Sequence, residues 1–253
     1  MALPYTVDTH RPTQIGLVTL QSDETIERDF RMLLPSDVEL LVSRVPSSAT
    51  VSLDSLHAME DSLTASARLL PVGADLAAVG YGCTSASAAI GAARVAGLIK
   101  AGVSTPHVSD PLTSLIAACL AGGITKIGLV SPYVASVSDR LIQGLDAAGI
   151  AVSSFGSFDE PLEERVVRIS RGSIRDAAIH VGRNGTCDAV FMSCTNLRAL
   201  EVIDEIEAEM LDGWQPVLDE TLRPLLERLR VAALLPLQVA TRQAAARKRA
   251  AEP

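Results

Sequence analysis

The chain reads Asp75-Leu-Ala-Ala-Val-Gly-Tyr-Gly-Cys83-Thr84-Ser85 where an apolar run meets a cysteine and two hydroxyl residues. Residues 188–196 repeat this pattern as Asp-Ala-Val-Phe-Met-Ser-Cys-Thr-Asn, and the two cysteines lie 111 positions apart. A short apolar run bounded by turn residues is typical of a buried parallel strand, and Thr-Ser or Thr-Asn is typical of a helix start. Each copy therefore predicts a buried strand that delivers its cysteine to the start of a helix.

Two further segments recur at nearly the same offset. Ile15-Gly-Leu-Val18 reappears as Ile127-Gly-Leu-Val130, 112 positions later, and residues 106–110 resemble residues 216–220, 110 positions later. One such match can arise by chance. Three matches in the same order at nearly one offset indicate an internal duplication.

Apolar and amphipathic segments alternate along the chain. The expected strands are residues 14–20, 76–81, 126–130 and 189–192. The expected helices are residues 25–34, 53–70, 85–100, 111–121, 136–148, 162–181 and 196–211. Strands that alternate with helices predict an α/β protein, and the duplication predicts two doubly wound parallel-sheet lobes related by a pseudo-twofold axis, with the active site between them. We expect the first lobe at residues 1–112, the second at 113–220, and an atypical C-terminal helix and basic tail at 221–253.

Composition excludes several classes of function. The chain has 253 residues, of which 48% are hydrophobic and 21% charged, as is usual for a globular protein. A net charge of −8 argues against a nucleic-acid partner, because phosphate binding needs a basic surface. No segment has the roughly 20 apolar residues of a membrane span, and the N-terminus lacks the features of a secretory signal. We therefore expect a cytoplasmic protein with no membrane partner.

The repeated cysteines are the candidate catalytic residues. In open α/β sheets ligands bind beyond the carboxyl ends of the strands, where Cys83 and Cys194 are expected. A helix N-terminus lowers the pKa of a thiol and so favours the reactive thiolate. Two thiols that face one carbon can move a proton from opposite sides, or one can add covalently while the other acts as an acid. The alternative is a small buried apolar cysteine, which is what we expect of Cys119 and Cys187.

The sequence predicts no cofactor and no metal. The four cysteines form no Cys-x-x-Cys pair, so a structural zinc site is not expected. Gly80-Tyr-Gly82 follows an expected strand, but the third glycine of a dinucleotide fingerprint is missing. A bound nicotinamide cofactor is therefore not expected either.

The two cysteine motifs carry a family resemblance. Gly82-Cys83-Thr84-Ser85 and Ser193-Cys194-Thr195-Asn196 together resemble the paired-cysteine signature of the aspartate/glutamate racemase superfamily, and most closely its maleate cis-trans isomerase and arylmalonate decarboxylase branch. Residues 21–27 and 194–198 are similar to ectoine-utilization proteins of that branch. The resemblance implies a racemase-like fold and a cofactor-independent enzyme acting on a small carboxylate. It also implies Cys83 as nucleophile or base, Cys194 as the partner acid or base, and self-association as a homodimer.

Other positions are carried over from the resemblance one at a time. Tyr133, in Ser131-Pro132-Tyr133 after an expected strand, resembles the family tyrosine that hydrogen-bonds substrate; the alternative is an ordinary turn tyrosine. Four more residues would bind a substrate carboxylate, and they are equally well explained as plain helix caps. These are Thr84, Ser85, Thr195 and Asn196.

Asp23 departs from the family pattern. Maleate isomerases have a carboxylate-binding Asn at the position that Asp23 takes in this chain. An aspartate repels a second substrate carboxylate and favours an amino group. This makes an amino acid or an ectoine-derived diamino acid a better substrate than maleate. The alternative is that Asp23 is an exposed cap of the helix expected at residues 25–34.

The C-terminal segment departs as well. Family members continue Pro-Val-Leu with a Ser-Ser-Asn run and a Trp-His helix, whereas this chain continues Asp219-Glu-Thr-Leu-Arg-Pro224. From Thr221 onward the chain has seven basic and two acidic residues. This shift indicates an altered tail, which puts the packing of the first lobe and the activity in question.

The sequence thus predicts an isomerase or racemase with two catalytic cysteines and no cofactor, acting on a small amino or dicarboxylic acid in ectoine catabolism. One alternative is an arylmalonate decarboxylase-like enzyme, which needs only one cysteine as proton donor. Another is a non-catalytic binder of small carboxylates on the same fold.

Overall fold

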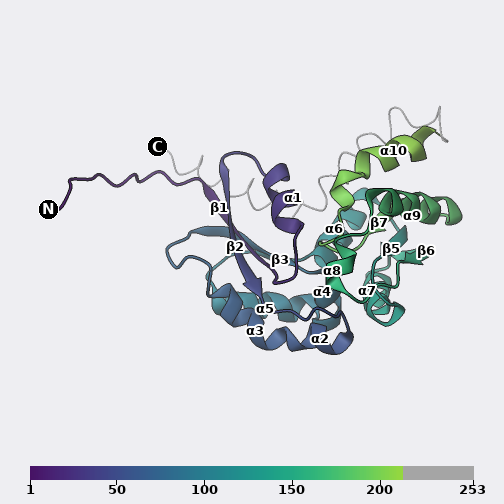
Figure 1. Ribbon diagram of the computed structural model, residues 1–253, viewed down its shortest axis with the longest axis horizontal. Helices are drawn as coiled ribbons and strands as arrows, with labels where there is room; N and C mark the ends of the chain where they lie inside the picture. The colour runs from purple at the N-terminus through teal and green to yellow at the C-terminus, as the bar shows by residue number, and fades with distance from the viewer. Residues whose placement is uncertain (213–253) are drawn as a thin grey trace.

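The computed structural model describes residues 1–212 and contains two parallel sheets (Figure 1). The first sheet consists of β1 (Thr13–Leu20), β2 (Val38–Val45), β3 (Leu76–Gly82) and β4 (Val108–Ser109). The second consists of β5 (Lys126–Ser131), β6 (Ala151–Ser157) and β7 (Ala189–Met192). The sequence repeat at residues 216–220 and the tail expected at 221–253 lie outside the described residues.

The two sheets share one strand order. In the first, β1 lies between β2 and β3, and β4 adds beyond β3; in the second, β5 lies between β6 and β7. All of these pairs are parallel. Each central strand carries the Ile-Gly-Leu-Val repeat, and the strand that leads to each repeated cysteine pairs directly with it. This is the arrangement that an internal duplication produces, and the predicted α/β class with two parallel sheets is confirmed.

Helices connect the strands. Before β5 they are α1 (Ile26–Leu33), α2 (Leu53–Ala58), α3 (Glu60–Ala67), α4 (Thr84–Ile90), α5 (Ala92–Gly102) and α6 (Pro111–Gly122). After β5 they are α7 (Ala135–Ala147), α8 (Glu163–Val166), α9 (Arg171–Asn184), the 3₁₀ turn η1 (Ala199–Glu201) and α10 (Ile203–Asp212). In Figure 1, α2, α3 and α5 lie along one face of the first sheet, opposite α1.

Four predicted helices were wrong in their extent. Residues 53–70 form α2 and α3, and residues 85–100 form α4 and α5, which part at Gly91. Gly91 has φ +94°, a left-handed conformation that glycine adopts without strain. Residues 162–181 form α8 and α9, and the Ser170 side chain caps α9 by accepting from the Ser173 N–H. The helix expected at 196–211 begins only at Ile203, after η1.

The two halves of the chain share a hydrophobic core at the ends of β3 and β5. Tyr133, Val137 and Val166 from the C-terminal half pack in the same cluster as Cys83 and Ala86. Helix α4 packs against α7 at this junction. The carboxyl ends of the two cysteine strands are therefore brought to one place. The predicted lobe boundary between residues 112 and 113 falls inside α6 and stays a prediction.

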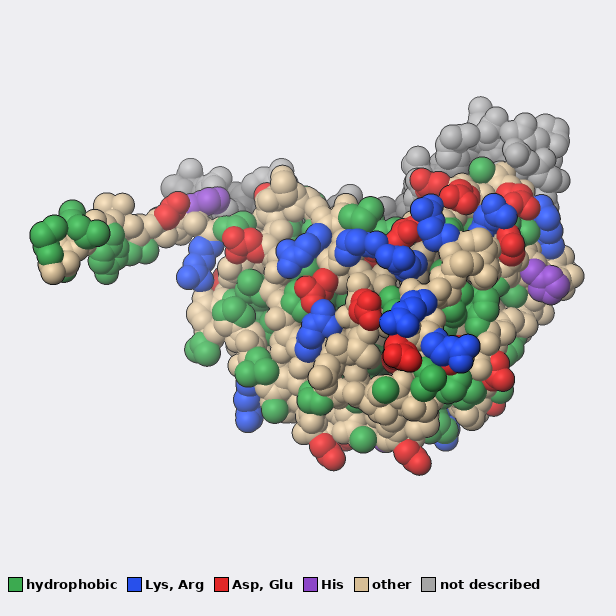
Figure 2. Space-filling view, in the orientation of Figure 1, with side chains coloured by type: hydrophobic (Ala, Val, Ile, Leu, Met, Phe, Trp, Pro, Cys, Tyr) green, Lys and Arg blue, Asp and Glu red, His purple; other side chains and the backbone are tan. Residues whose placement is uncertain are grey.

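The surface shown in Figure 2 mixes both signs of charge. Arg28 of α1 pairs with Glu201 of η1, and Arg171 of α9 lies 3.2 Å from Glu205 of α10. Such exposed pairs contribute at most about 1 kcal/mol each. The Arg28–Glu201 pair nevertheless joins the N-terminal half to the segment that follows Cys194. Across residues 1–212, none of the helices combines the length and the apolar character needed to cross a bilayer.

A glycine pair in α5 gives a test of this packing. A Cβ on Gly102 would lie 2.4 Å from the Thr64 carbonyl oxygen and 2.7 Å from the Ala67 Cβ, so Gly102→Ala forces α3 and α5 apart. We expect a loss of about 1–3 kcal/mol in the free energy of unfolding. Exposed Gly97, in the middle of α5, has open space around it, and Gly97→Ala should add about 0.5–1 kcal/mol. Urea unfolding of both variants measures the difference; equal effects would show that α3 and α5 are not in close contact.

Candidate active site

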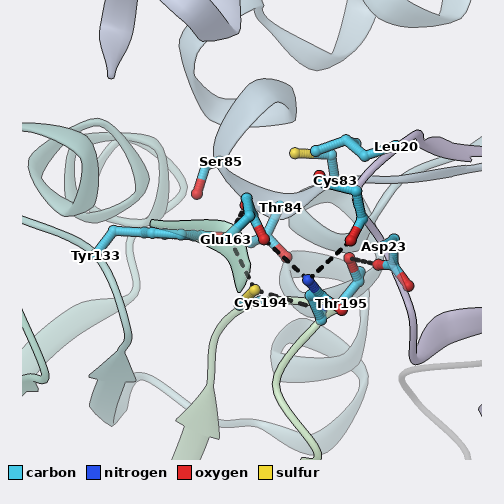
Figure 3. Close-up of a pocket in the computed structure, with 11 residues that line it drawn as sticks. Leu20, Asp23, Cys83, Thr84, Ser85, Tyr133, Glu163, Cys194 and Thr195 are labelled. Atoms are coloured by element: carbon cyan, nitrogen blue, oxygen red, sulfur yellow. Dashed lines mark hydrogen bonds between the residues drawn. The ribbon is translucent and has the colours of Figure 1, made fainter. Parts of the chain in front are cut away.

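A small cavity lies where the two halves meet (Figure 3). It is lined by Leu20, Ser22, Asp23, Cys83, Thr84, Ser85, Tyr133, Glu163, Cys194, Thr195 and Asn196. The structure thus brings together all eight residues that the sequence singled out, while their roles stay predictions. The cavity volume is about 10 Å³, room for roughly one water molecule.

Cys83 sits at a strand-to-helix junction, as predicted. It follows β3 and is the N-cap of α4, where its Sγ accepts a hydrogen bond of 3.4 Å from the Ala86 N–H. The Cys83 side chain is buried, and burial raises its pKa to about 12. The Ala86 N–H opposes that rise, and the Glu163 charge adds to it. The expected lowering of the thiol pKa by a helix start is therefore wrong here, because burial outweighs one turn of N–H groups.

Cys194 lies in a loop rather than at a helix start, contrary to the prediction. Its φ is +107°, a strained conformation for any residue other than glycine. Its Sγ accepts from the Asn196 N–H at 3.3 Å and lies 3.0 Å from the Tyr133 hydroxyl oxygen. Burial raises the pKa of Cys194 well above its usual value, and the negative charge of Glu163 raises it further. Both thiols are therefore protonated in this arrangement at neutral pH.

Glu163 is a site residue that the sequence did not predict. It lies at the start of α8 and is buried, with 3% of its surface exposed. Its Oε1 accepts from the Tyr133 hydroxyl at 2.6 Å, and its Oε2 accepts from the Asn196 Nδ2 at 2.9 Å. Burial raises the pKa of Glu163, and these two donors oppose the rise. Nothing in the local pattern separates it from its exposed neighbour Glu164.

Asp23 both caps a helix and borders the cavity. Its Oδ1 accepts from the backbone N–H groups of Thr25 and Ile26, at 2.9 and 2.8 Å, where α1 begins. Its Oδ2 accepts from the Thr195 hydroxyl at 2.9 Å. Only 4% of Asp23 is exposed, so the alternative of an exposed cap is wrong. Burial also raises the pKa of Asp23.

Some of the remaining polar residues of the cavity are engaged in hydrogen bonds within the protein, and others have hydroxyls left free for a ligand. The Thr195 hydroxyl oxygen also lies 3.1 Å from the Gly82 carbonyl oxygen, and Asn196 Oδ1 accepts from the Glu24 N–H. No hydrogen bond within residues 1–212 engages the hydroxyls of Thr84 or Ser85, although both residues are buried at the cavity. These two hydroxyls are the donors that a bound anion could use.

Contacts between the segment before α1 and the Cys194 loop border the cavity. The Asp23–Thr195 bond is one, and the Glu24 N–H and Thr25 hydroxyl bonds to Asn196 are others. The cavity holds about one water, so its lining must rearrange before a small acid can fit among these side chains.

The charge of the site is negative. Its eleven described lining residues include Asp23 and Glu163 but no Lys, Arg or His. Across the described part of the chain, no three His, Cys, Asp or Glu side chains are grouped to hold a metal ion. A cationic group on a bound molecule would offset the two carboxylates.

The raised pKa of Glu163 gives a prediction about stability and pH. A carboxyl whose pKa is higher in the folded than in the unfolded state stabilises the protein at low pH, and this contribution is lost as the pH rises through the folded value. A glutamine side chain cannot ionise, so Glu163→Gln should raise the melting temperature relative to the wild type more at pH 8 than at pH 4. Exposed Glu164→Gln, with the same change of charge, should show no such trend. If the melting temperature of Glu163→Gln differed from that of the wild type by the same amount at pH 4 and pH 8, the presence of a buried charge on Glu163 would be contradicted.

Comparisons with known proteins agree with this fold. The family model of arylmalonate decarboxylase matches residues 47–232. No curated protein matches the chain significantly. A variant of the maleate isomerase from Pseudomonas putida S16, solved with maleate, is 19% identical, with a TM-score of 0.68 over 78% of this chain and 84% of that one.

Two other solved structures extend the comparison. A variant of the Nocardia farcinica maleate cis-trans isomerase, with a covalently bound succinylcysteine intermediate, is 21% identical, with a TM-score of 0.69 over 78% of this chain and 84% of that one. An unliganded arylmalonate decarboxylase is 21% identical, with a TM-score of 0.63 over 87% of this chain and 92% of that one. At these identities the solved structures establish a shared racemase-like fold, as predicted. Because the family model spans well over half of the sequence, the chain belongs to the arylmalonate decarboxylase family.

Proposed function

We propose that the protein is a cofactor-independent, cysteine-dependent isomerase or racemase of a small amino or dicarboxylic acid, similar in chemistry to maleate isomerase. The observation that carries the proposal is that Cys83 and Cys194, from equivalent strands of the two sheets, line one cavity. Family membership and the maleate isomerase structures support it. The predicted cytoplasmic location and homodimer remain predictions from the sequence.

Two forms of the chemistry fit a pair of thiols. In a racemase, the Cys83 thiolate takes the Cα proton, the electron pair delocalises into the substrate carboxyl group, and the Cys194 S–H returns a proton on the opposite face. In a cis-trans isomerase, the Cys83 sulfur forms a bond to one alkene carbon and the electron pair moves toward the carboxylate at the other. Rotation about the resulting single bond and loss of Cys83 then give the other isomer. Both cycles are redox-neutral. The cis-trans cycle returns Cys83 unchanged, whereas one racemase turnover leaves Cys83 protonated and Cys194 ionised, so protons exchange with solvent before the next turnover in the same direction.

The cavity lining favours a substrate with an amino group. The free hydroxyls of Thr84 and Ser85 are suited to a carboxylate, whereas Asp23 and Glu163 are suited to an ammonium group. The two carboxylates raise the pKa of Cys83, and a bound cation would act in the opposite direction. An amino acid would therefore help to generate the thiolate that attacks it. The finer proposal, an ectoine-derived diamino acid, rests on Asp23 and on the resemblance of residues 21–27.

A comparison of substrates tests this proposal. Diaminobutyrate derivatives should be turned over at least about tenfold faster than maleate, which corresponds to about 1.4 kcal/mol of transition-state stabilisation. Asp23→Asn should shrink this ratio by a similar factor, because the amide no longer repels a second carboxylate. Asp110→Asn is the matched control, since Asp110 is a buried cap of α6 outside the cavity. Faster turnover of maleate by the wild type would show that Asp23 does not select an amino group.

An arylmalonate decarboxylase-like reaction is the second candidate, and the family model favours it. Loss of CO₂ from a malonate leaves an electron pair on the α-carbon, and one thiol suffices to protonate it. The presence of both thiols at the cavity speaks against this reaction. Release of CO₂ from an arylmalonate, unaffected by loss of one of the two cysteines, would favour the decarboxylase.

A further inference from the structure

Glu163 is a buried carboxylate without a cation. None of the ion pairs within residues 1–212 includes it. Its oxygens are instead satisfied by the Tyr133 hydroxyl and the Asn196 amide. Burying a charge with neutral partners alone is costly, so this arrangement is expected only where the carboxylate has a task.

The hydrogen bonds around Tyr133 have only one consistent direction when Glu163 is ionised. A carboxylate can only accept, so the single hydroxyl proton of Tyr133 is directed to Glu163 Oε1 at 2.6 Å. The Tyr133 oxygen also lies 3.0 Å from the Cys194 sulfur, and toward that sulfur it has only a lone pair to offer. Cys194 must therefore donate its S–H to Tyr133, while its sulfur accepts from the Asn196 N–H at 3.3 Å.

We propose that Glu163 is a positioning residue that acts through Tyr133: by accepting the tyrosine proton, it turns the tyrosine oxygen toward the Cys194 S–H and holds Cys194 as a proton donor. This inference rests on the proposed function, because a proton donor matters only if the site carries out proton transfer. It separates the two thiols, since the Cys83 sulfur accepts from the Ala86 N–H, and the buried hydroxyl of Tyr81, the tyrosine near Cys83, has no carboxylate within residues 1–212 to accept its proton. Cys83 is then the base or nucleophile, and Cys194 is the acid.

The negative charges around the pair act in the same direction on Cys194, and the Asn196 N–H opposes them. Asp23 faces the cavity from the segment before α1, Cys83 from the start of α4 and Tyr133 from the segment after β5. Charges on Glu163 and Asp23 both raise the pKa of Cys194. Burial and the charges of Cys194 and Glu163 raise the pKa of Tyr133, so the hydroxyl keeps its proton. No lysine, arginine or histidine among the described lining residues opposes this effect.

The test is a pH titration of the thiols in the full-length protein. The protein is labelled with [3-¹³C]cysteine, the four Cβ signals are assigned with single Cys→Ser variants, and each signal is followed up to about pH 10.5. In Glu163→Gln the charge is lost and the amide can donate to Tyr133, which frees the tyrosine proton for a thiolate. The Cys194 signal should then move toward the thiolate position about one pH unit or more earlier, a tenfold change in ionisation constant. Glu164→Gln should match the wild type, and a Cys194 signal that is equally unmoved in both variants would overturn the proposal.

Tyr133→Phe provides the second variant, which removes one hydroxyl and tests the direction of the hydrogen bond. If the tyrosine accepts from Cys194, its loss destabilises the thiol, and ionisation of Cys194 becomes easier. If the tyrosine instead donates to a thiolate, ionisation becomes harder, and that outcome overturns the proposal even if Glu163→Gln does not fold. Neither titration requires a substrate. A wild-type protein that turns over nothing would therefore contradict the proposed function and leave the titration to decide the role of Glu163.

Discussion

Cys83→Ser should lower turnover by about 10²- to 10⁴-fold, the range that one positioned proton-transfer group contributes. The substitution is nearly isosteric and keeps an acceptor for the Ala86 N–H at the start of α4. A serine hydroxyl, however, is far less acidic than a thiol, and it offers neither a comparable nucleophile nor a comparable base. The measurement is kcat on the best substrate of the panel of amino and dicarboxylic acids, with the melting temperature recorded alongside it.

The matched control for Cys83 is Cys187→Ser. Cys187 is a half-buried thiol before β7, and its sulfur lies 3.7 Å from the Gly182 carbonyl oxygen, outside the cavity. The same chemical change there should leave kcat within about twofold of the wild type, as expected for a residue remote from the reacting groups. Equal losses in the two variants would mean that loss of a thiol acts through stability, and Cys83 would have no special role.

Cys194→Ser should have an effect of similar size, about 10²–10⁴-fold on kcat, but at a different step. Without the acid a racemase stops after the first step, because the electron pair on the substrate carbon receives no proton from Cys194. If Cys83 instead adds covalently to an alkene, solvent can protonate the adduct at that carbon, and the variant should accumulate a protein species heavier by the mass of one substrate molecule. Intact-mass spectrometry after incubation detects this species.

The double variant is the control for that adduct. With both cysteines replaced by serine, the mass increase should disappear, because no thiol remains in the cavity. An adduct that persists would place the nucleophile elsewhere. Full activity of Cys194→Ser would instead favour single-cysteine chemistry, as in a decarboxylase.

The central part of each sheet could be predicted because it is buried on both faces. β1, β3 and β5 are largely buried apolar runs, and they are strands in the structure. β7 is a partly buried edge strand, but its four residues are all apolar. β2 and β6 are edge strands that interleave polar residues, as in Ala-Val-Ser-Ser-Phe-Gly-Ser, and β4 has only two residues. When polar and apolar residues alternate over so few positions, the pattern is too weak to distinguish a strand from a loop.

The site residues could be predicted where a sequence motif is repeated in both halves of the chain, and could not be predicted where no such repeat exists. Cys83 and Cys194 stand out because the duplication places the same Cys-Thr pair after equivalent strands. The loop at Cys194 could not be foreseen, because the contact that accompanies its φ of +107° comes from Tyr133, which lies 61 positions away in the chain. Glu163 was missed for the same reason, since only tertiary packing distinguishes it from Glu164.

The most direct measurement of the central claim is the incorporation of solvent deuterium at the substrate α-carbon. Small amino and dicarboxylic acids are incubated in D₂O with the wild type, Cys83→Ser and Cys194→Ser, and the products are analysed by mass spectrometry. Two thiols that act on one substrate predict interconversion of isomers by the wild type and its loss in each single variant. Deuterium enters the product in the racemase form, which breaks the Cα–H bond, and stays out in the cis-trans form, which breaks none. Interconversion retained in both variants would contradict the account.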